Sequence, residues 1–462
     1  MIEPTTLRYF NPKLERASRK EILGLQLDKL RYQLGYLYQK NRFYRRLFEA
    51  AKFEPEKLRS LQEFSEKVPF VQKEDFLKDQ DETPPYGERL GIPPEKLSQI
   101  HLTSGTSGVG REIYGLTRRD VEGAGLTWMN HWHWIGLTKG DIALSVQPVT
   151  NLAAGLSSFH GMNKMGLVPF QTFGVDSETK LQLMKRFRPH FLTLTTAYAL
   201  RLTLLAQQTG FVPQRDLPNL KGLCIAGESY PIPLARDLEE FWNTRIHEFY
   251  GSTQGGTIFA FTCEYGVLRH GERGCMHLLD PYYYTEVIDP ETLKPVGPGE
   301  EGEAVVTVLY REASPVVRFR THDKVRYYPY NHCPCGRPYS IWEAGNVSRY
   351  DDMMKIKGTN VWPSMVDGVL FSRPEADEYA GQVWIDAQGR EHVLIRLAFK
   401  DSHPRSAEEK ERLMAELSRE LLRQTGVTMA VKEVPRNELP IYEFKARRWT
   451  DERKKGLERK AG

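Results

Sequence analysis

A loop of small and hydroxyl-bearing residues is the part of the sequence best suited to holding phosphate. It consists of Thr103, Ser104, Gly105, Thr106, Ser107 and Gly108. Its two glycines let the backbone approach an anion closely, and its amides and hydroxyls donate hydrogen bonds to phosphate oxygens. The loop lacks the Gly-Lys-Ser/Thr ending and the spacing of a Walker loop. Taken alone, it favours an ordinary polar turn over a phosphate site.

A second candidate for chemistry is the pair Cys333 and Cys335, separated by a proline and followed by a glycine. A turn of this kind can point two thiolates at one metal ion. The alternative is free thiols. Five cysteines in 462 residues, mostly late in the sequence, do not form a disulfide framework. We therefore expect a reducing, cytoplasmic location.

Length and composition exclude several classes of protein. The 462 residues are 40% hydrophobic and 27% charged, which is ordinary globular usage and excludes collagen-like, low-complexity and wholly disordered chains. No window offers the ~18 uninterrupted apolar residues of a membrane span, and the first residues lack an apolar leader. The net charge of +4 comes partly from residues 452–460, with no basic stripe interleaved with aromatics. We expect a soluble, non-exported protein that binds neither membrane nor nucleic acid.

The pattern of apolar residues predicts the elements that position these groups. A capping box, Ser18 to Glu21, opens a long helix. Further on, short β-rich runs alternate with helical stretches, which indicates an α/β fold with a mainly parallel sheet. The expected strands are residues 99–102, 142–146, 191–195, 222–226 and 303–308, and the expected helices include residues 180–187 and 232–242.

After Gly345 the composition changes, and we expect a small C-terminal α+β domain. Residues 353–361 suggest paired strands, and residues 382–399 suggest more strand. Ser406, with Glu409 three residues on, opens a helix that Gly426 ends. The predicted domains are residues 1–348, a large α/β body of several subdomains with mainly parallel sheets, and residues 349–462.

Several further motifs accompany the small-residue loop in a fixed order. They include Ala226-Gly227-Glu228-Ser229, Tyr250-Gly251-Ser252-Thr253-Gln254, Arg318-Phe319-Arg320-Thr321-His322-Asp323, Ser348-Arg349-Tyr350-Asp351 and Lys445-Ala446-Arg447-Arg448. In this order the set resembles the motifs of adenylate-forming enzymes, and most closely the phenylacetate-CoA ligase family. The resemblance spans nearly the whole chain.

The resemblance implies an ATP-dependent, AMP-forming carboxylate-CoA ligase that acts on an aromatic or arylacetic acid through an acyl-adenylate. ATP, Mg²⁺ and CoA are the implied cofactors and co-substrates, and the resemblance allows a homodimer. An acyl-adenylating enzyme that passes its product to a carrier-protein thiol or an amine is an alternative. A catalytically inactive nucleotide-binding homologue is a second alternative.

The resemblance also implies roles for the nucleotide-binding residues. The loop from Thr103 to Gly108 closes over the ATP β- and γ-phosphates, Tyr250 stacks on adenine, and Asp323 accepts both ribose hydroxyls. The remaining implied contacts are Gly227, Glu228, Gly251, Ser252 and Thr253, of which Thr253 touches the α-phosphate. Gln254 stands where most relatives have a glutamate associated with magnesium, and an amide is a weaker ligand for a hard cation.

Lys445 is the implied decisive cation. Negative charge gathers when a carboxylate attacks the α-phosphorus, and a positioned lysine lowers that barrier. A solvated lysine in a basic cluster is the alternative. Arg349 is expected to reach ribose or phosphate, and Asp351 matches the pivot about which the small, mobile domain turns between adenylation and thiol transfer.

Two further sites follow from the resemblance. The acyl pocket is expected beside Ala154, Gly155 and Ala226, whose small side chains leave room for a flat ring. Cys263 and His277 lie in a stretch that matches metal-bearing members of the family. With Cys333 and Cys335 they would form a structural Cys₃His zinc site, although Cys275 and His270 are alternative ligands.

Overall fold

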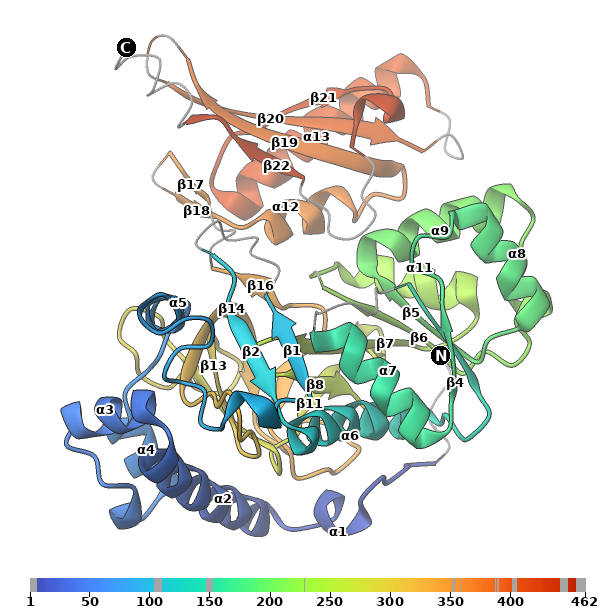
Figure 1. Cartoon of the computed structure of the whole chain (residues 1–462). Helices are drawn as coiled ribbons and strands as arrows, with labels where there is room; N and C mark the ends of the chain where they lie inside the picture. The colour runs from blue at the N-terminus through green and yellow to red at the C-terminus, as the bar shows by residue number, and fades with distance from the viewer. Residues whose placement is uncertain are drawn as a thin grey trace.

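The computed structural model describes residues 6–103, 110–146, 153–227, 229–350, 354–357, 359–386, 388, 390–400, 405–440 and 448–453. It has a large body, which holds the N-terminal and central parts of the chain, and a small C-terminal domain above it (Figure 1).

The body begins with a group of helices that precede the sheets. They are α1 (Pro12–Glu15), α2 (Arg19–Lys40), α3 (Arg42–Ala50), α4 (Leu61–Lys67) and α5 (Lys73–Glu82), with short 3₁₀ turns at Pro55–Lys57 and Pro94–Lys96. Helix α2 begins at the predicted capping box, in which the Ser18 side chain accepts from the Glu21 backbone N–H and the Glu21 side chain accepts from the Ser18 backbone N–H. The predicted long helix is therefore confirmed.

One twelve-stranded sheet forms the centre of the body. Its order is β12-β13-β14-β15-β11-β8-β7-β6-β5-β3-β4, with β16 paired to β14. The five strands at one end are mutually parallel: β3 (Ile142–Ser145), β4 (Val168–Gln171), β5 (Phe191–Thr195), β6 (Gly222–Ala226) and β7 (Ile246–Ser252). Strands β5 and β6 have the predicted bounds, because both are short runs buried at every position and so carry a continuous apolar signal.

The other strands of the sheet are antiparallel to their neighbours. They are β8 (Thr257–Thr262), β11 (Cys275–Leu278), β12 (Tyr283–Ile288), β13 (Glu301–Val308), β14 (Phe319–Tyr328), β15 (Ile341–Glu343) and β16 (Ser348–Arg349). Two small hairpins stand apart from this sheet: β1 (Gln99–Leu102) with β2 (Ile113–Leu116), and β9 (Leu268–Arg269) with β10 (Glu272–Arg273). The predicted fold class is confirmed, with a sheet that is parallel at one end only.

Helices cover both faces of the parallel strands. On β7, His247 and Phe249 face α6, whereas Glu248 faces Tyr230, which lies two residues before α11. Successive side chains of a strand point to opposite faces of the sheet, so neighbouring residues of β7 contact helices on opposite sides. The helices between the strands are α6 (Arg118–Ile135), α7 (Ala153–Met165), α8 (Ser177–Phe187), α9 (Thr196–Gln208), α10 (Pro213–Asp216) and α11 (Ile232–Trp242).

The described residues of the small domain form two sheets and include helices α12 and α13. A four-stranded sheet has the order β21-β20-β19-β22, formed by β19 (Ala376–Ile385), β20 (Glu391–Phe399), β21 (Ala430–Glu433) and β22 (Trp449–Asp451). The predicted paired strands are the hairpin of β17 (Met354–Ile356) and β18 (Thr359–Val361). The helices are α12 (Pro363–Leu370) and α13 (Ala407–Thr425), and a 3₁₀ turn spans Arg436–Glu438. Helix α13 has the predicted capping box and ends at Gly426, which adopts a left-handed conformation.

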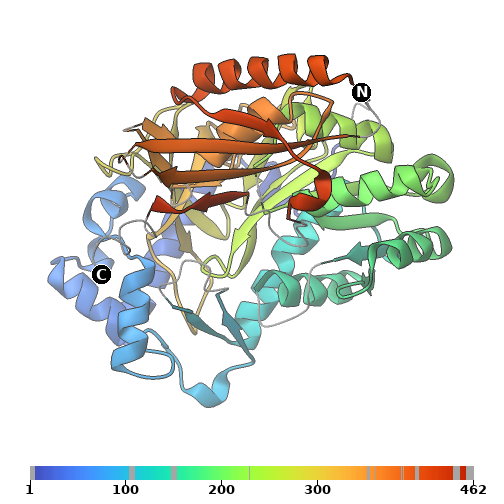
Figure 2. The same cartoon turned by 90° about the horizontal axis from the view of Figure 1, so that it is seen from above.

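The body and the small domain have separate hydrophobic cores. The body's cluster runs from Ile22 to Ala344, and the main cluster of the small domain from Met354 to Met429. Seen from above, the small domain lies between the N-terminal helices and the helices of the parallel half (Figure 2). The predicted domain boundary at Arg349 stays a prediction. No helix in the described ranges is both long and apolar enough to cross a membrane.

Candidate functional site

The carboxyl ends of the parallel strands bring several predicted residues to one edge of the sheet. Ala226 ends β6 and Gly227 follows it, while Tyr250, Gly251 and Ser252 end the neighbouring strand β7. In open α/β sheets, ligands bind in the crevice outside the carboxyl ends of the strands. This edge is therefore the candidate nucleotide site.

Tyr250, Asp323 and Arg349 form the polar centre of this site. The Tyr250 hydroxyl donates to Asp323 Oδ2 at 2.5 Å, and Arg349 Nη1 lies 3.7 Å from Asp323 Oδ1. Asp323 and Arg349 are paired in register on β14 and β16. Burial and the adjacent Asp323 charge raise the pKa of Tyr250 well above its ordinary value, so the hydroxyl stays protonated and remains a donor. Tyr250 and Arg349 thus share the carboxylate of Asp323.

The ring of Tyr250 is held by other aromatic residues. Its centroid lies 5.2 Å from that of Phe259 and 5.3 Å from that of Trp342, both in edge contacts. Such contacts fix a ring while leaving its face able to stack on a flat partner. Gly251 follows at a bulge, where a Cβ would lie 2.4 Å from the Thr257 carbonyl oxygen. The backbone conformation after Tyr250 therefore requires glycine.

A tight turn after β7 carries Thr253 and Gln254. The Thr253 carbonyl accepts from the Gly256 backbone N–H at 3.0 Å, and the Gln254 carbonyl accepts from Arg311 Nη1 at 2.9 Å. The Gln254 side chain is held by a hydrogen bond, in which its Nε2 donates to Glu112 Oε2 at 2.7 Å. The turn is thereby joined to the segment that follows the small-residue loop.

Thr103 anchors the beginning of the small-residue loop. It is buried, its backbone N–H donates to the Glu112 carbonyl at 3.1 Å, and its Oγ1 accepts from the Glu112 N–H at 2.9 Å. The loop therefore joins two paired strands, β1 and β2. Several predicted site residues lie outside the described residues: Ser104, Gly105, Thr106, Ser107, Gly108, Glu228, Asp351 and Lys445.

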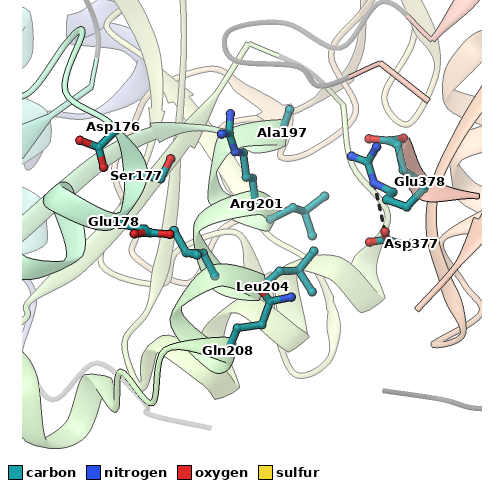
Figure 3. A pocket seen from close by; sticks show the side chains of 12 residues that line it. Asp176, Ser177, Glu178, Ala197, Arg201, Leu204, Gln208, Asp377 and Glu378 are labelled. Carbon is teal, nitrogen blue, oxygen red and sulfur yellow. Dashed lines mark ion pairs between the residues drawn. The ribbon is translucent and has the colours of Figure 1, made fainter. Parts of the chain in front are cut away.

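The residues predicted for the acyl pocket lie on two elements. Ala154 and Gly155 are in the first turn of α7, and Ala226 ends β6. A cavity of about 400 Å³ lies elsewhere, between α8 and α9 of the body and the small domain (Figure 3). Its lining is mixed: Leu200, Leu204 and Leu205 are apolar, and the charged residues are Asp176, Glu178, Arg201, Asp377, Glu378 and Arg436. An ion pair of 3.1 Å joins Arg436 to Asp377 within it.

Four predicted metal ligands meet in the interior of the body. The donor atoms of Cys263, His277, Cys333 and Cys335 all lie within 4.8 Å of one another, and all four residues are buried. The Cys263 and Cys333 sulfurs are 3.8 Å apart, and Cys335 Sγ is 3.4 Å from His277 Nε2. A tetrahedral zinc site with Zn–S bonds of about 2.3 Å has sulfurs about 3.8 Å apart. The donor set and its spacing therefore fit zinc.

The electrostatics of this cluster favour a thiolate. Hydrogen bonds from Cys263 and Cys333 lower the pKa of Cys335, and the charge of His277 acts in the same direction. Cys275 is buried two residues before His277 on β11, outside the group of four whose donor atoms converge. His270, in the β9–β10 connection, is also outside that group.

Two buried carboxylates close to the site, Glu112 before β2 and Glu248 on β7, were not among the predicted site residues. Glu112 contacts Gln254, and Glu248 accepts from the Tyr230 hydroxyl at 2.8 Å and from the Gly345 N–H at 2.6 Å. Burial raises the pKa of Glu248 to about 7. The sequence did contain a signal for each residue. Glu112 is an acidic residue directly before a short apolar strand, and Glu248 is an acidic residue within a buried one.

Comparisons with known proteins identify the family of the chain. The family model described as AMP-binding enzyme matches residues 38–308, and the one described as AMP-binding enzyme C-terminal domain matches residues 358–453. The first match alone covers more than half of the 462 residues. The chain belongs to the family of AMP-binding enzymes.

Among curated proteins, the chain is similar to phenylacetate-coenzyme A ligases. The phenylacetate-coenzyme A ligase of Aromatoleum evansii is 28% identical over 90% of this chain and 91% of its own length. That of Thermus thermophilus is 27% identical over 79% of both chains. The predicted relationship to the phenylacetate-CoA ligases is confirmed.

Among solved structures, 2-hydroxyisobutyryl-CoA ligase is similar along the whole chain. In its postadenylation state with 2-HIB-AMP, the TM-score is 0.87 at 24% identity, over 100% of this chain and 96% of the other. With CoA in the thioesterification state, the TM-score is 0.69 at 25% identity, over the same shares. The overall arrangement of body and small domain therefore resembles the postadenylation state more closely.

Proposed function

We propose that this enzyme is an AMP-forming acid-CoA ligase. A carboxylate oxygen of the acid attacks the α-phosphorus of ATP, the acyl-adenylate forms and pyrophosphate leaves. The CoA thiol then attacks the acyl carbon, and AMP leaves with the electron pair of the broken bond. The observation that carries the proposal is the convergence of Tyr250, Asp323 and Arg349 with the Thr253–Gln254 turn at one edge of the sheet. The family membership of the chain supports it.

Tyr250 and Asp323 bind the nucleoside part of ATP. The Tyr250 ring stacks on adenine, and the Asp323 carboxylate accepts the two ribose hydroxyls. The present bond from the Tyr250 hydroxyl to Asp323 supports this role, because it identifies Asp323 as an acceptor at the site. Arg349, whose Nη1 lies 3.7 Å from Asp323 Oδ1, contacts the ribose or the phosphates of the bound nucleotide.

Charge at the reacting phosphorus is offset from several sides. Thr253 contacts the α-phosphate, Thr103 and the loop after it hold the β- and γ-phosphates, and Lys445 stabilises the charge that builds up during attack. Mg²⁺, when bound, neutralises phosphate charge. Gln254 lies close to the phosphates in this arrangement, because it is the residue after Thr253 in the same turn.

The small domain serves the two half-reactions in two orientations. Asp351 is the proposed pivot, and its place between β16 of the body and β17 of the small domain suits that role. The higher TM-score against the postadenylation state supports assignment of the present arrangement to the first half-reaction. For the second, the small domain turns and presents another surface to the acyl-adenylate.

The proposed acid is aromatic or arylacetic. The names of the curated relatives support this class, and small residues at Ala154, Gly155 and Ala226 leave room for a flat ring beside the adenylate. A homodimer stays a prediction, which light scattering on the purified protein would test.

We also propose a structural zinc ion held by Cys263, His277, Cys333 and Cys335. All four positions of a tetrahedral ion are filled by protein ligands, so such an ion has no open position for substrate. Bound there, zinc ties together β11, the end of β8 and the turn before β15.

Pyrophosphate release across a panel of carboxylic acids, with and without CoA, tests the proposed function. We expect release with an aromatic or arylacetic acid, and an acyl-CoA product only when CoA is present. Thioester formation on a carrier protein in place of CoA would support the carrier-protein alternative. No release with any acid at any Mg²⁺ concentration would refute the proposal.

A further inference from the structure

Glu112 is a buried carboxylate beside the phosphate loop. It precedes β2, and its exposed fraction is 0%. Two hydrogen bonds between the Glu112 backbone and Thr103, one of them to Thr103 Oγ1, fix its position directly before β2. The residue is therefore as rigidly placed as the strands on either side of the loop.

The Glu112 side chain faces the turn after β7. Its Oε1 accepts from the Tyr114 hydroxyl at 2.7 Å, and its Oε2 accepts from Gln254 Nε2 at 2.7 Å. Because Gln254 Nε2 donates to Glu112 Oε2, the amide group and the carboxylate lie side by side. Both are close to Thr103, the residue that leads into the phosphate loop, since Thr103 Oγ1 accepts from the Glu112 N–H.

We propose that Glu112 supplies the carboxylate on the magnesium side of the ATP site, with Gln254 as its hydrogen-bonded partner. The inference rests on the proposed function. Glu112 supplies the negative charge that the cation requires, and Gln254 is the neutral member of the pair. Oxygen donors of these two kinds are those that Mg²⁺ accepts, and the donor set therefore fits the ion.

A purely structural role for Glu112 makes a different prediction. Arg89 is also buried, lies 4.0 Å from the Phe76 ring and 4.4 Å from the Tyr114 ring, and donates to the Ile113 carbonyl. In the described part of the chain, its Nε and Nη1 have no hydrogen-bond partner. A carboxylate that served only as counterion to Arg89 would support folding without affecting the response to Mg²⁺.

Exchange of the two side chains distinguishes these roles. The variants are Glu112→Gln, Gln254→Glu and the double variant that carries both changes. The matched control is Glu286→Gln, since Glu286 is a buried carboxylate paired with Arg318 at 2.9 Å on the edge strand β12. Each protein is titrated with Mn²⁺ in the presence of a non-hydrolysable ATP analogue, and the bound ion is measured by electron paramagnetic resonance. Melting temperature and the Mg²⁺ dependence of pyrophosphate release are measured in parallel.

We expect Glu112→Gln to weaken Mn²⁺ binding about tenfold or more, and the double variant to recover most of it. Glu286→Gln should lower the melting temperature and leave Mn²⁺ binding unchanged. Wild-type Mn²⁺ binding by Glu112→Gln, together with active wild-type enzyme, would overturn the inference and leave the proposed function intact. Failure of the double variant to recover binding would also overturn it.

The single variant Gln254→Glu keeps the proposal testable if Glu112→Gln does not fold. It adds a second carboxylate beside the first, so we expect tighter Mn²⁺ binding in the presence of the nucleotide analogue. Unchanged affinity would count against a cation next to this pair. Inactive wild-type enzyme would instead count against the proposed function.

Discussion

The candidate nucleotide site and the Cys₃His cluster are both polar constellations in one body, but they are built differently. At the nucleotide site, Tyr250 and Arg349 lie near strand ends, Asp323 lies within β14, and the Arg349 side chain is 42% exposed. In the cluster, all four residues are buried and their donor atoms face one another. The first arrangement can exchange its internal hydrogen bonds for those of a ligand, whereas the second is closed.

This difference separates the expected consequences of mutation. Groups at the sheet edge should affect rate or nucleotide affinity with little effect on folding. Groups in the cluster should affect folding with little direct effect on chemistry, because a filled tetrahedral site has no position for substrate. The predictions below test that separation.

The largest effect is expected at Lys445. Lys445→Ala should lower the rate of pyrophosphate release by about 10²–10³, because charge at the α-phosphorus loses its positioned cation. ATP binding, measured by calorimetry, should persist. The control is Lys432→Ala on β21, an exposed lysine. Unchanged turnover of the Lys445 variant would remove this residue from the mechanism.

The cluster should respond in the opposite way. Cys333→Ser should abolish stoichiometric zinc, measured by mass spectrometry of the purified protein, and lower the apparent melting temperature by about 5 °C or more. The remaining folded enzyme should retain most of its turnover. Cys224→Ser is the control, since Cys224 is a buried cysteine on β6 outside the cluster. Equal zinc content in wild type and Cys333→Ser would contradict the assignment.

Asp323 should affect nucleotide affinity without affecting stability. Asp323→Asn should raise the KM for ATP by about tenfold or more, because a charged acceptor of two hydroxyls is replaced by a neutral one. Tyr250→Phe is the control: it removes the hydroxyl bond to Asp323 but keeps the ring, so the KM should change by less than about threefold. An equal loss in both variants would mean that the hydroxyl bond, rather than ribose recognition, is what matters.

The smallest effect is expected at Glu248, which is buried like the cluster but lies on β7, two residues before Tyr250. Its pKa in the folded protein is raised from 4.5 to about 7, so the folded state binds this proton more tightly than the unfolded state. The resulting stabilisation is complete below about pH 4.5 and is lost as the pH rises through about 7.

The stability of wild type relative to Glu248→Gln should therefore fall by roughly 1–2 kcal/mol between about pH 5.5 and 7. Urea denaturation of both proteins at each pH measures this difference. A difference that stays constant with pH would show that Glu248 is already ionised in the folded protein.

Much of the fold could be predicted from local sequence. Strands β5 and β6 and helix α11 have the predicted bounds, because their apolar runs and flanking residues signal an element without reference to the rest of the chain. The predicted strand 382–399 is instead the hairpin of β19 and β20, interrupted at residues 386–390. The polar residues Asp386 to Arg390 carried the turn signal, since the Asp386 side chain accepts from the Arg390 backbone N–H.

The candidate site was less accessible to prediction. The order of motifs indicated Tyr250 and Asp323 because it resembles a known family. The pair Glu112 and Gln254 could not be predicted, because the two residues are 142 positions apart and meet only when the hairpin lies against the turn after β7. Cys275 and His277 are two residues apart on β11, so their side chains lie on the same face of the strand. The sequence could not show that His277 belongs to the metal-binding group and Cys275 does not, because only the distances between donor atoms distinguish them.

One strand connects the nucleotide edge with the small domain. Asp323 on β14 faces Tyr250, and the next residue, Lys324, places its Nζ 4.7 Å from the centroid of the Trp362 ring, which belongs to the small domain. A cation–π contact of this kind contributes about 0.5–2 kcal/mol, only a few times the thermal energy. This contact between the body and the small domain can therefore break at little cost, and Lys324 then stays held on the body by its ion pair of 2.8 Å with Glu301.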